Sequence, residues 1–114
     1  MKQDSTKHLG FLIFPGFPMA CLTSAIEPLR AANEIVGRRT FSWTVVGETA
    51  SRVVSSAAVG FDPDVGLTDL EHVDQLYFVS GPTGRFQAAR TGNAAVRRLD
   101  RHGAALGAFS GGIF

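Results

Sequence analysis

The C-terminal stretch 103–114 presents a single hydroxyl between an apolar run and a glycine pair. Small and apolar residues lead into Ser110, and Gly111 and Gly112 follow it directly. In α/β proteins, a strand that turns sharply into a helix can expose one nucleophilic side chain at the carboxyl end of the sheet. The strict form of that turn has glycine two residues before the serine, where this chain has Ala108. Ser110 is therefore a candidate nucleophile, and a buried strand with a glycine-rich turn is the alternative.

A serine hydroxyl needs a base within hydrogen-bond reach to become a nucleophile. The chain has 3 histidines, namely His8, His72 and His102. His8 precedes the first expected strand and His72 follows a short turn. His102 ends a helix, which in an alternating α/β topology lies at the opposite edge of the sheet from Ser110. Unless a base lies beyond residue 114, we expect no hydrolysis by Ser110.

Composition indicates one globular domain with a substantial core. Of the 114 residues, 45% are apolar and 18% are charged, and the net charge is +1. Such a charge gives no general attraction to nucleic acid or membranes. A single cysteine, Cys21, excludes an internal disulfide and is typical of a reducing cytosol. We expect a cytoplasmic protein that needs no metal or cofactor, with residues 1–7 as a disordered lead-in.

Apolar runs without alternation predict buried parallel strands. They occur near 8–14, 41–47, 74–80 and 104–109. Helical spacing of apolar residues predicts helices over 19–36 and 93–101. Pro28 lies inside the first helix, where it costs about 3 kcal/mol in a regular helix. We expect an irregular hairpin over 48–67 and a helical turn over 67–72.

Alternation of strands and helices predicts a doubly wound parallel sheet with right-handed crossovers. Sheets of this kind bind ligands beyond the carboxyl ends of their strands. Three loops, at 15–18, 80–84 and 110–112, follow strands at that edge. We therefore expect them to form one pocket mouth, with the residues Gly16, Phe17, Gly81, Pro82, Ser110 and Gly111. Gly81 and Gly84 either admit a polar group of a ligand or simply form a turn.

The charged residues of the two helices have simpler interpretations. Glu27 either points to the site or pairs with Arg30 three residues later, and we expect the surface pair. The arginines of the second helix predict a solvated face rather than a DNA contact, because no aromatic residues interleave with them. They are Arg97, Arg98 and Arg101.

Four runs of residues resemble one known family over nearly the whole chain from His8 to Phe114. They read Phe-Pro-Gly-Phe at 14–17, Ile-Glu-Pro-Leu-Arg-Ala-Ala-Asn at 26–33, Arg-Arg-Leu-Asp-Arg-His-Gly at 97–103 and Leu-Gly-Ala-Phe-Ser-Gly-Gly at 106–112. These runs resemble the PfpI-like, class I glutamine amidotransferase-like N-terminal domain of AraC-family transcriptional regulators of the GlxA type. The resemblance also accounts for Pro28.

The resemblance implies a flavodoxin-like domain, three-layered α/β/α, that senses a small molecule and forms a homodimer. DNA binding then belongs to a C-terminal pair of helix-turn-helix motifs that this chain lacks. Enzymatic relatives have a cysteine at the position of Ser110 and an acidic residue at the position of Cys21. We expect Cys21 to be one of the ligand-binding residues here. The resemblance thus implies a non-catalytic sensor for an effector such as an amine or amino-acid derivative. The alternative is a hydrolase or amidotransferase-type enzyme that uses Ser110.

We expect residues 8–114 to be the N-terminal part of such a domain, truncated after the position of the nucleophile. The four residues that follow Ser110 are too few for the helix that would hold it, since helices below about 12 residues are marginal in water. The last strand then exposes an edge and apolar side chains, which favours self-association or low stability.

Overall fold

The computed structural model describes residues 6–110. In chain order, the elements are β1 (Lys7–Ile13), α1 (Met19–Val36), β2 (Phe41–Gly47), β3 (Val53–Val54), β4 (Gly60–Phe61), β5 (Val65–Gly66), the 3₁₀ helix η1 (Leu67–Asp69), β6 (Gln75–Ser80), α2 (Ala89–Arg101) and β7 (Ala105–Ser110). All four expected long strands are present and shifted by at most one residue. β1 begins at Lys7 and so includes the last residue of the expected lead-in.

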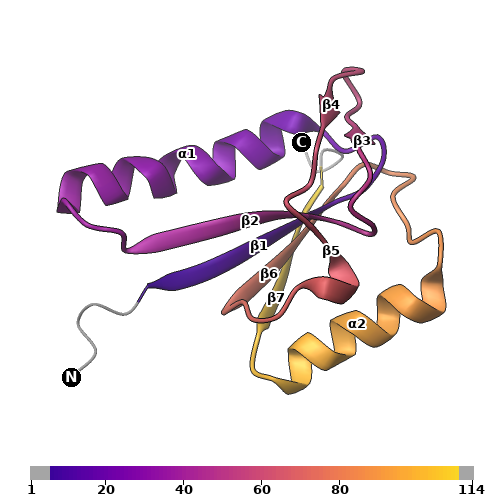
Figure 1. Ribbon diagram of the computed structural model, residues 1–114. Helices are drawn as coiled ribbons and strands as arrows, with labels where there is room; N and C mark the ends of the chain where they lie inside the picture. The colour runs from indigo at the N-terminus through magenta and orange to yellow at the C-terminus, as the bar shows by residue number, and fades with distance from the viewer. Residues whose placement is uncertain (1–5, 111–114) are drawn as a thin grey trace.

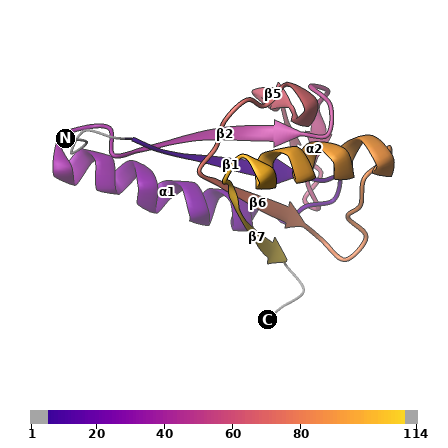
Figure 2. The ribbon, with the colours of Figure 1, turned by 90° about the horizontal axis from the view of Figure 1, so that it is seen from below.

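Five strands form one parallel sheet in the order β5-β2-β1-β6-β7, as Figure 2 shows. β3 and β4 form a separate antiparallel pair. The chain starts at the central strand, moves outward to β2 through α1, and then crosses β1 to β6. This confirms the doubly wound, flavodoxin-like topology. It also places the reversal of strand order between β1 and β6, where such sheets bind ligands.

The two helices cover opposite faces of the sheet (Figure 1). Alternate side chains of β1 divide between the faces, as the pleat requires. Leu9, Phe11 and Ile13 pack in a cluster with residues of α1, whereas Leu12 packs with residues of α2 and η1. A strand buried on both faces explains the unbroken apolar run in its sequence.

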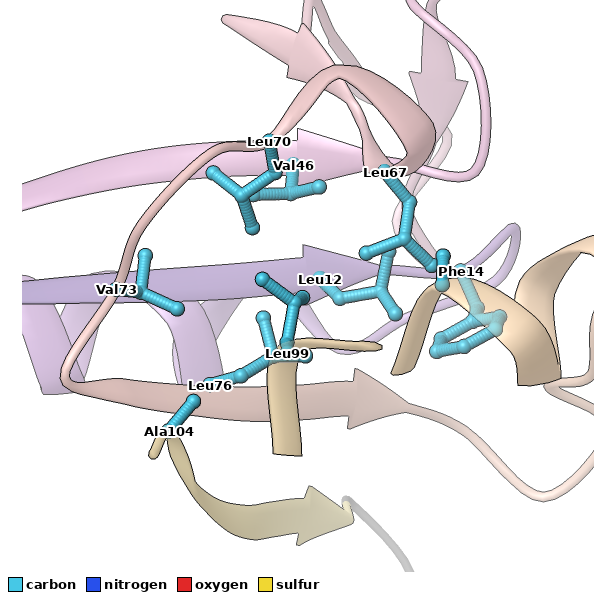
Figure 3. Close-up of a cluster of buried hydrophobic side chains, with 10 residues drawn as sticks. Leu12, Phe14, Val46, Leu67, Leu70, Val73, Leu76, Leu99 and Ala104 are labelled. Atoms are coloured by element: carbon cyan, nitrogen blue, oxygen red, sulfur yellow. The ribbon is translucent and has the colours of Figure 1, made fainter. Parts of the chain in front are cut away.

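The cluster beneath α2 closes one face of the sheet (Figure 3). Strands, η1 and α2 all contribute to it: Leu12, Phe14, Val46, Leu67, Leu70, Val73, Leu76, Ala95, Leu99 and Ala104. Leu12 and Leu76 are fully buried. This cluster fixes α2 and η1 against the sheet.

α1 runs unbroken through Pro28 and ends where Asn33 joins it to the next strand. Gly37 adopts the left-handed conformation that closes a helix, with φ of 84°, and its N–H donates to the Asn33 carbonyl. The Asn33 side chain accepts the N–H groups of Thr40 and Phe41 and donates to the Phe41 carbonyl, each at 2.9 Å. The amide therefore fixes where β2 begins.

α2 and β5 correct the sequence prediction. α2 begins at Ala89, not at residue 93. The Glu48 carboxylate accepts the N–H groups of Gln87 at 2.8 Å and Ala88 at 2.6 Å, which supplies the N-terminal acceptor from a distant loop. The stretch 48–67 contains the expected hairpin, but its end forms β5, which adds a parallel strand beside β2. The expected helical turn over 67–72 is limited to η1.

Candidate functional site

The loops that follow β1 and β6 touch at the carboxyl edge of the sheet. Gly16 has φ of +84°, and a Cβ atom placed on Gly81 would lie 2.9 Å from the Gly16 carbonyl oxygen. Only a residue without a side chain allows this approach. The Gly84 N–H donates to the Gly81 carbonyl at 3.1 Å, so a turn forms here, and Pro82 lies exposed in it.

The β3–β4 hairpin clamps the loop after β1 from the other side. The Gly16 N–H donates to the Val54 carbonyl and the Ser56 N–H donates to the Phe17 carbonyl, both at 2.8 Å. Phe17 is fully buried, and its ring centroid lies 5.2 Å from that of Phe61. The buried Phe17 side chain therefore anchors the loop to the core, and the backbone at Gly16 stays exposed.

A crevice of about 440 Å³ opens between α1 and β7 beside these loops. We call it the α1–β7 crevice. Its lining residues are Ala20, Cys21, Ser24, Ala25 and Phe109. The lining contains no charged side chain and only two weakly polar groups, the Ser24 hydroxyl and the half-buried Cys21 thiol.

The β7 wall of the crevice is held by a stack of aromatic rings. The Phe109 ring lies 5.1 Å from the Tyr77 ring, and Tyr77 lies 5.7 Å from Phe11. Gly107 makes room for this stack, because a Cβ atom there would lie 2.6 Å from the Tyr77 ring. Packed aromatic rings thus form this wall.

Ser110 is the last residue of β7, and its backbone pairs with Ser80 in the parallel ladder. It therefore lies at the same edge of the sheet as Gly16 and Gly81. The candidate site residue Gly111 lies outside the described residues. The loops expected to share one edge start at that edge, and whether they share one pocket stays a prediction.

The histidines lie at the other edge. His8 is the second residue of β1, His72 precedes β6, and His102 is the C-cap residue of α2. Asp74 joins them: its carboxylate accepts the His8 N–H at 2.7 Å and lies 3.5 Å from His72 Nε2. His102 therefore lies at the edge expected for it, and His8 and His72 lie at that same edge.

Glu27 takes the surface pairing expected for it. Its carboxylate lies 2.9 Å from the guanidinium of Arg30, which also pairs with Glu34 at 2.9 Å. These groups sit on the exposed side of α1. Among residues 6–110, no cluster of three or more histidine, cysteine, aspartate or glutamate side chains could hold a metal ion.

Two residues of this edge were missed by sequence reasoning. Phe109 was assigned only to a strand, although the alternation of β7 places it against α1. Period-two alternation along β7, which places Phe109 on the same face as Gly107, offered a signal. Glu48 had no local signal, because it acts on Gln87 and Ala88, about 40 residues away.

Comparison with curated proteins finds relatives among transcriptional regulators. The chain is 33% identical over 116 residues to the HTH-type transcriptional regulator CdhR of Pseudomonas aeruginosa, which covers 98% of this chain and 32% of CdhR. It is 30% identical to GbdR of the same species, with 94% of this chain and 29% of GbdR covered. It is also 30% identical to the HTH-type regulator GlxA of Rhizobium meliloti, with 96% and 34% covered. The chain therefore spans about a third of the length of the curated relatives it matches.

Solved structures show the same fold. An AraC family transcriptional regulator from Pseudomonas putida superposes with a TM-score of 0.76 at 22% identity, over 90% of this chain and 55% of that one. A ThiJ/PfpI family protein from Pseudomonas syringae superposes with a TM-score of 0.63 at 18% identity, over 91% and 42%. No protein-family model matches the chain.

Proposed function

We propose that this chain, which is homologous to AraC-family regulators of the GlxA type, is the part of such a regulator that senses a small molecule without catalysis. Its effector binds in the α1–β7 crevice, with one end at the glycine backbone of the loops after β1 and β6. The expected site residues Gly16, Gly81 and Cys21 then surround the effector.

The crevice is the observation that carries this proposal. Small-molecule sites are concave and mostly apolar, with a few polar groups that fix orientation. The α1–β7 crevice combines apolar walls with the Ser24 hydroxyl and lies beside the end of β7. The loops at its edge are held by backbone hydrogen bonds, so the effector meets a preformed surface. A compact amine or amino-acid derivative with an apolar body suits this lining.

Two features support a role without catalysis. Ser110 would require a base, and the three histidines lie at the far edge of the sheet. The resemblance matches the acid of enzymatic relatives to Cys21, whose thiol cannot accept a hydrogen bond as a carboxylate does. The homologues are transcriptional regulators, which agrees with a domain that binds an effector and does not catalyse a reaction.

In the complete regulator, we propose that residues 8–114 form part of a sensor domain that dimerises and that a separate helix-turn-helix part binds DNA. Its place of action is then the cytoplasm. Within residues 6–110, neither helix is long and apolar enough to cross a membrane.

The direct test blocks the crevice. Small amines, amino acids and their derivatives are screened by thermal shift against the chain, against Ser24→Phe and against Thr23→Phe. Both residues are exposed, but Ser24 lines the crevice and its neighbour Thr23 does not. We expect hits that raise the melting temperature of the chain and of Thr23→Phe but not of Ser24→Phe. Hits that survive equally in Ser24→Phe would place the effector elsewhere.

A second test addresses catalysis. The chain and Ser110→Ala are assayed with activated esters and amides. We expect no turnover that depends on Ser110. Turnover that Ser110→Ala abolishes would contradict the non-catalytic assignment and support the hydrolase alternative.

A further inference from the structure

A second hollow lies on the opposite face of the sheet, between α2 and η1. Its volume is about 470 Å³, and it is lined by three arginines and two threonines, together with two alanines. We call it the α2–η1 groove. The polar lining residues are Arg90, Arg98, Arg101, Thr68 and Thr91.

Helical spacing brings the three guanidinium groups to one groove. Arg98 follows Arg90 by about two turns of α2, and Arg101 follows Arg98 by about one turn. The residues between them at the groove floor are Ala94 and Ala95, whose small side chains leave the space open. Ala95 is buried against the core, so the floor of the groove is the packed face of the helix.

The arginines of the groove have no acidic partner in the part of the chain that the structure describes. Arg52, by contrast, forms two contacts with the Asp62 carboxylate at 2.9 and 3.3 Å. No ion pair links Arg90, Arg98 or Arg101 to a carboxylate within residues 6–110. α2 holds four arginines and a single acid, Asp100. The groove therefore concentrates positive charge in a chain whose net charge is only +1.

One of these guanidinium groups is held in place before any ligand arrives. Arg98 Nη2 donates to the Leu70 carbonyl at 3.0 Å, and Arg98 is half-buried. Leu70 and Leu99 belong to the buried cluster between α2 and the sheet. Arg98 is thus anchored to the core and keeps further N–H donors for a ligand, since a guanidinium carries five.

We propose that the α2–η1 groove binds a multiply charged oxyanion of the phosphate class. The planar guanidinium fork matches phosphate oxygens in a bidentate manner, and the hydroxyls of Thr68 and Thr91 supply neutral donors beside it. The sequence predicts only a solvated face for Arg98 and Arg101. The groove changes that interpretation, because it joins Arg90 to Arg98 and Arg101 across a hollow.

The position of Arg97 distinguishes a small anion from a DNA backbone. Arg97 is exposed and does not line the groove, yet it lies on the same helix as Arg98 and Arg101. A polyanion lying along α2 would contact Arg97 as well as the groove. A small anion seated in the groove would not, and this is the mode that we propose.

The test is a titration of the chain with inorganic phosphate and pyrophosphate at constant ionic strength, followed by NMR of backbone and arginine Nε–H signals. We expect saturable shifts at α2 and η1. Arg90→Gln and Arg101→Gln should each weaken binding about tenfold, the loss expected for one charge-assisted interaction. The matched control Arg97→Gln should bind as the unchanged chain does. Ala94→Glu, which adds a charge to the floor, should abolish binding while the rest of the spectrum stays folded.

Non-saturable shifts would overturn the proposal. So would equal weakening by Arg97→Gln and Arg90→Gln, which would indicate a general polyanion surface. Binding of a DNA duplex that Arg97→Gln and Arg90→Gln weaken equally would also overturn it. Because the α1–β7 crevice lies on the other face of the sheet, Ser24→Phe should leave phosphate binding unchanged, so the two proposals fail separately.

Discussion

The two edges of the parallel sheet differ in the kind of group that they present. The amino edge carries three histidines and Asp74. The Asp74 carboxylate accepts the His8 N–H and forms an ion pair with His72, whereas His102 contacts the Arg98 carbonyl. The carboxyl edge carries the touching glycines of two loops and an uncharged crevice against α1. The histidines are therefore at one edge and the α1–β7 crevice is at the other.

This difference supports the proposal that the chain binds an effector without catalysis. Acid–base catalysis needs a base within about 3 Å of the hydroxyl. The sheet separates Ser110 from the histidines along the length of its strands, because His8 lies near the start of β1, His72 precedes β6 and His102 follows α2, whereas Ser110 ends β7. The predictions below test this division of roles.

The largest effect is expected at the carboxyl edge, for Gly81→Ala. The new Cβ atom would lie 2.9 Å from the Gly16 carbonyl oxygen, and a backbone atom cannot turn aside as a side chain can. We expect the free energy of unfolding to fall by about 1–3 kcal/mol, the usual cost of overpacking, as measured by urea denaturation. The effector response should fall with it.

Gly16→Ala is the matched control for Gly81→Ala. It meets no atom within 4 Å but requires φ of +84°, so it should cost about 1 kcal/mol. Equal stability of Gly81→Ala and the unchanged chain would show that the two loops do not touch.

A smaller, pH-dependent effect is expected at the amino edge. The N–H of His8 donates to the Asp74 carboxylate and lowers its pKa; the positive charges of His72, Lys7 and His8 act in the same direction and burial opposes them. Because the pKa is lower in the folded state, the carboxylate stabilises the fold above its unfolded pKa of about 3.9. This stabilisation is lost as the pH falls through the folded pKa.

Asp74→Asn tests this linkage. We expect it to lower stability at pH 6.5 and to lose most of that deficit near pH 3, when both proteins are followed by urea denaturation. A deficit of the same size at both pH values would mean that Asp74 acts through packing and not through its charge.

The smallest effect is expected for His102→Gln. The His102 ring lies at the exposed end of α2, with Nδ1 2.7 Å from the Arg98 carbonyl. Removal of the imidazole should change the free energy of unfolding by less than about 0.5 kcal/mol, as surface substitutions usually do, and should leave the effector-induced thermal shift unchanged. An altered effector response would break the assignment of binding to the carboxyl edge alone.

The fold was predictable from sequence because its strands are buried on both faces. An unbroken apolar run such as Leu9 to Phe14 has one structural interpretation when helical segments alternate with it. The boundaries of α1 were also predictable, since Gly37 closes the helix. Local rules disfavoured Pro28, but its ring sits on an exposed part of α1, and tertiary packing of the apolar face outweighs one missing hydrogen bond.

The start of α2 and the sites were less accessible to sequence reasoning. Glu48 caps α2 across a large separation in sequence, and no local pattern reports such a contact. The α1–β7 crevice depends on which side of β7 Phe109 takes, and the α2–η1 groove depends on η1 lying beside α2. Both are properties of packed pairs of elements, which periodicity within one element does not contain.

The central position of β1 has a consequence for the order in which the fold can form during synthesis. β1 leaves the ribosome first, yet its partners come much later: His8 meets Ser42 across 34 residues and Asp74 across 66. Parallel pairings over such separations fold slowly, because loop closure precedes any gain in contacts. The nascent segment up to β2 would therefore expose the apolar face of Leu12 until η1 and α2 emerge. A chaperone that protects apolar chain segments would act within this window of translation.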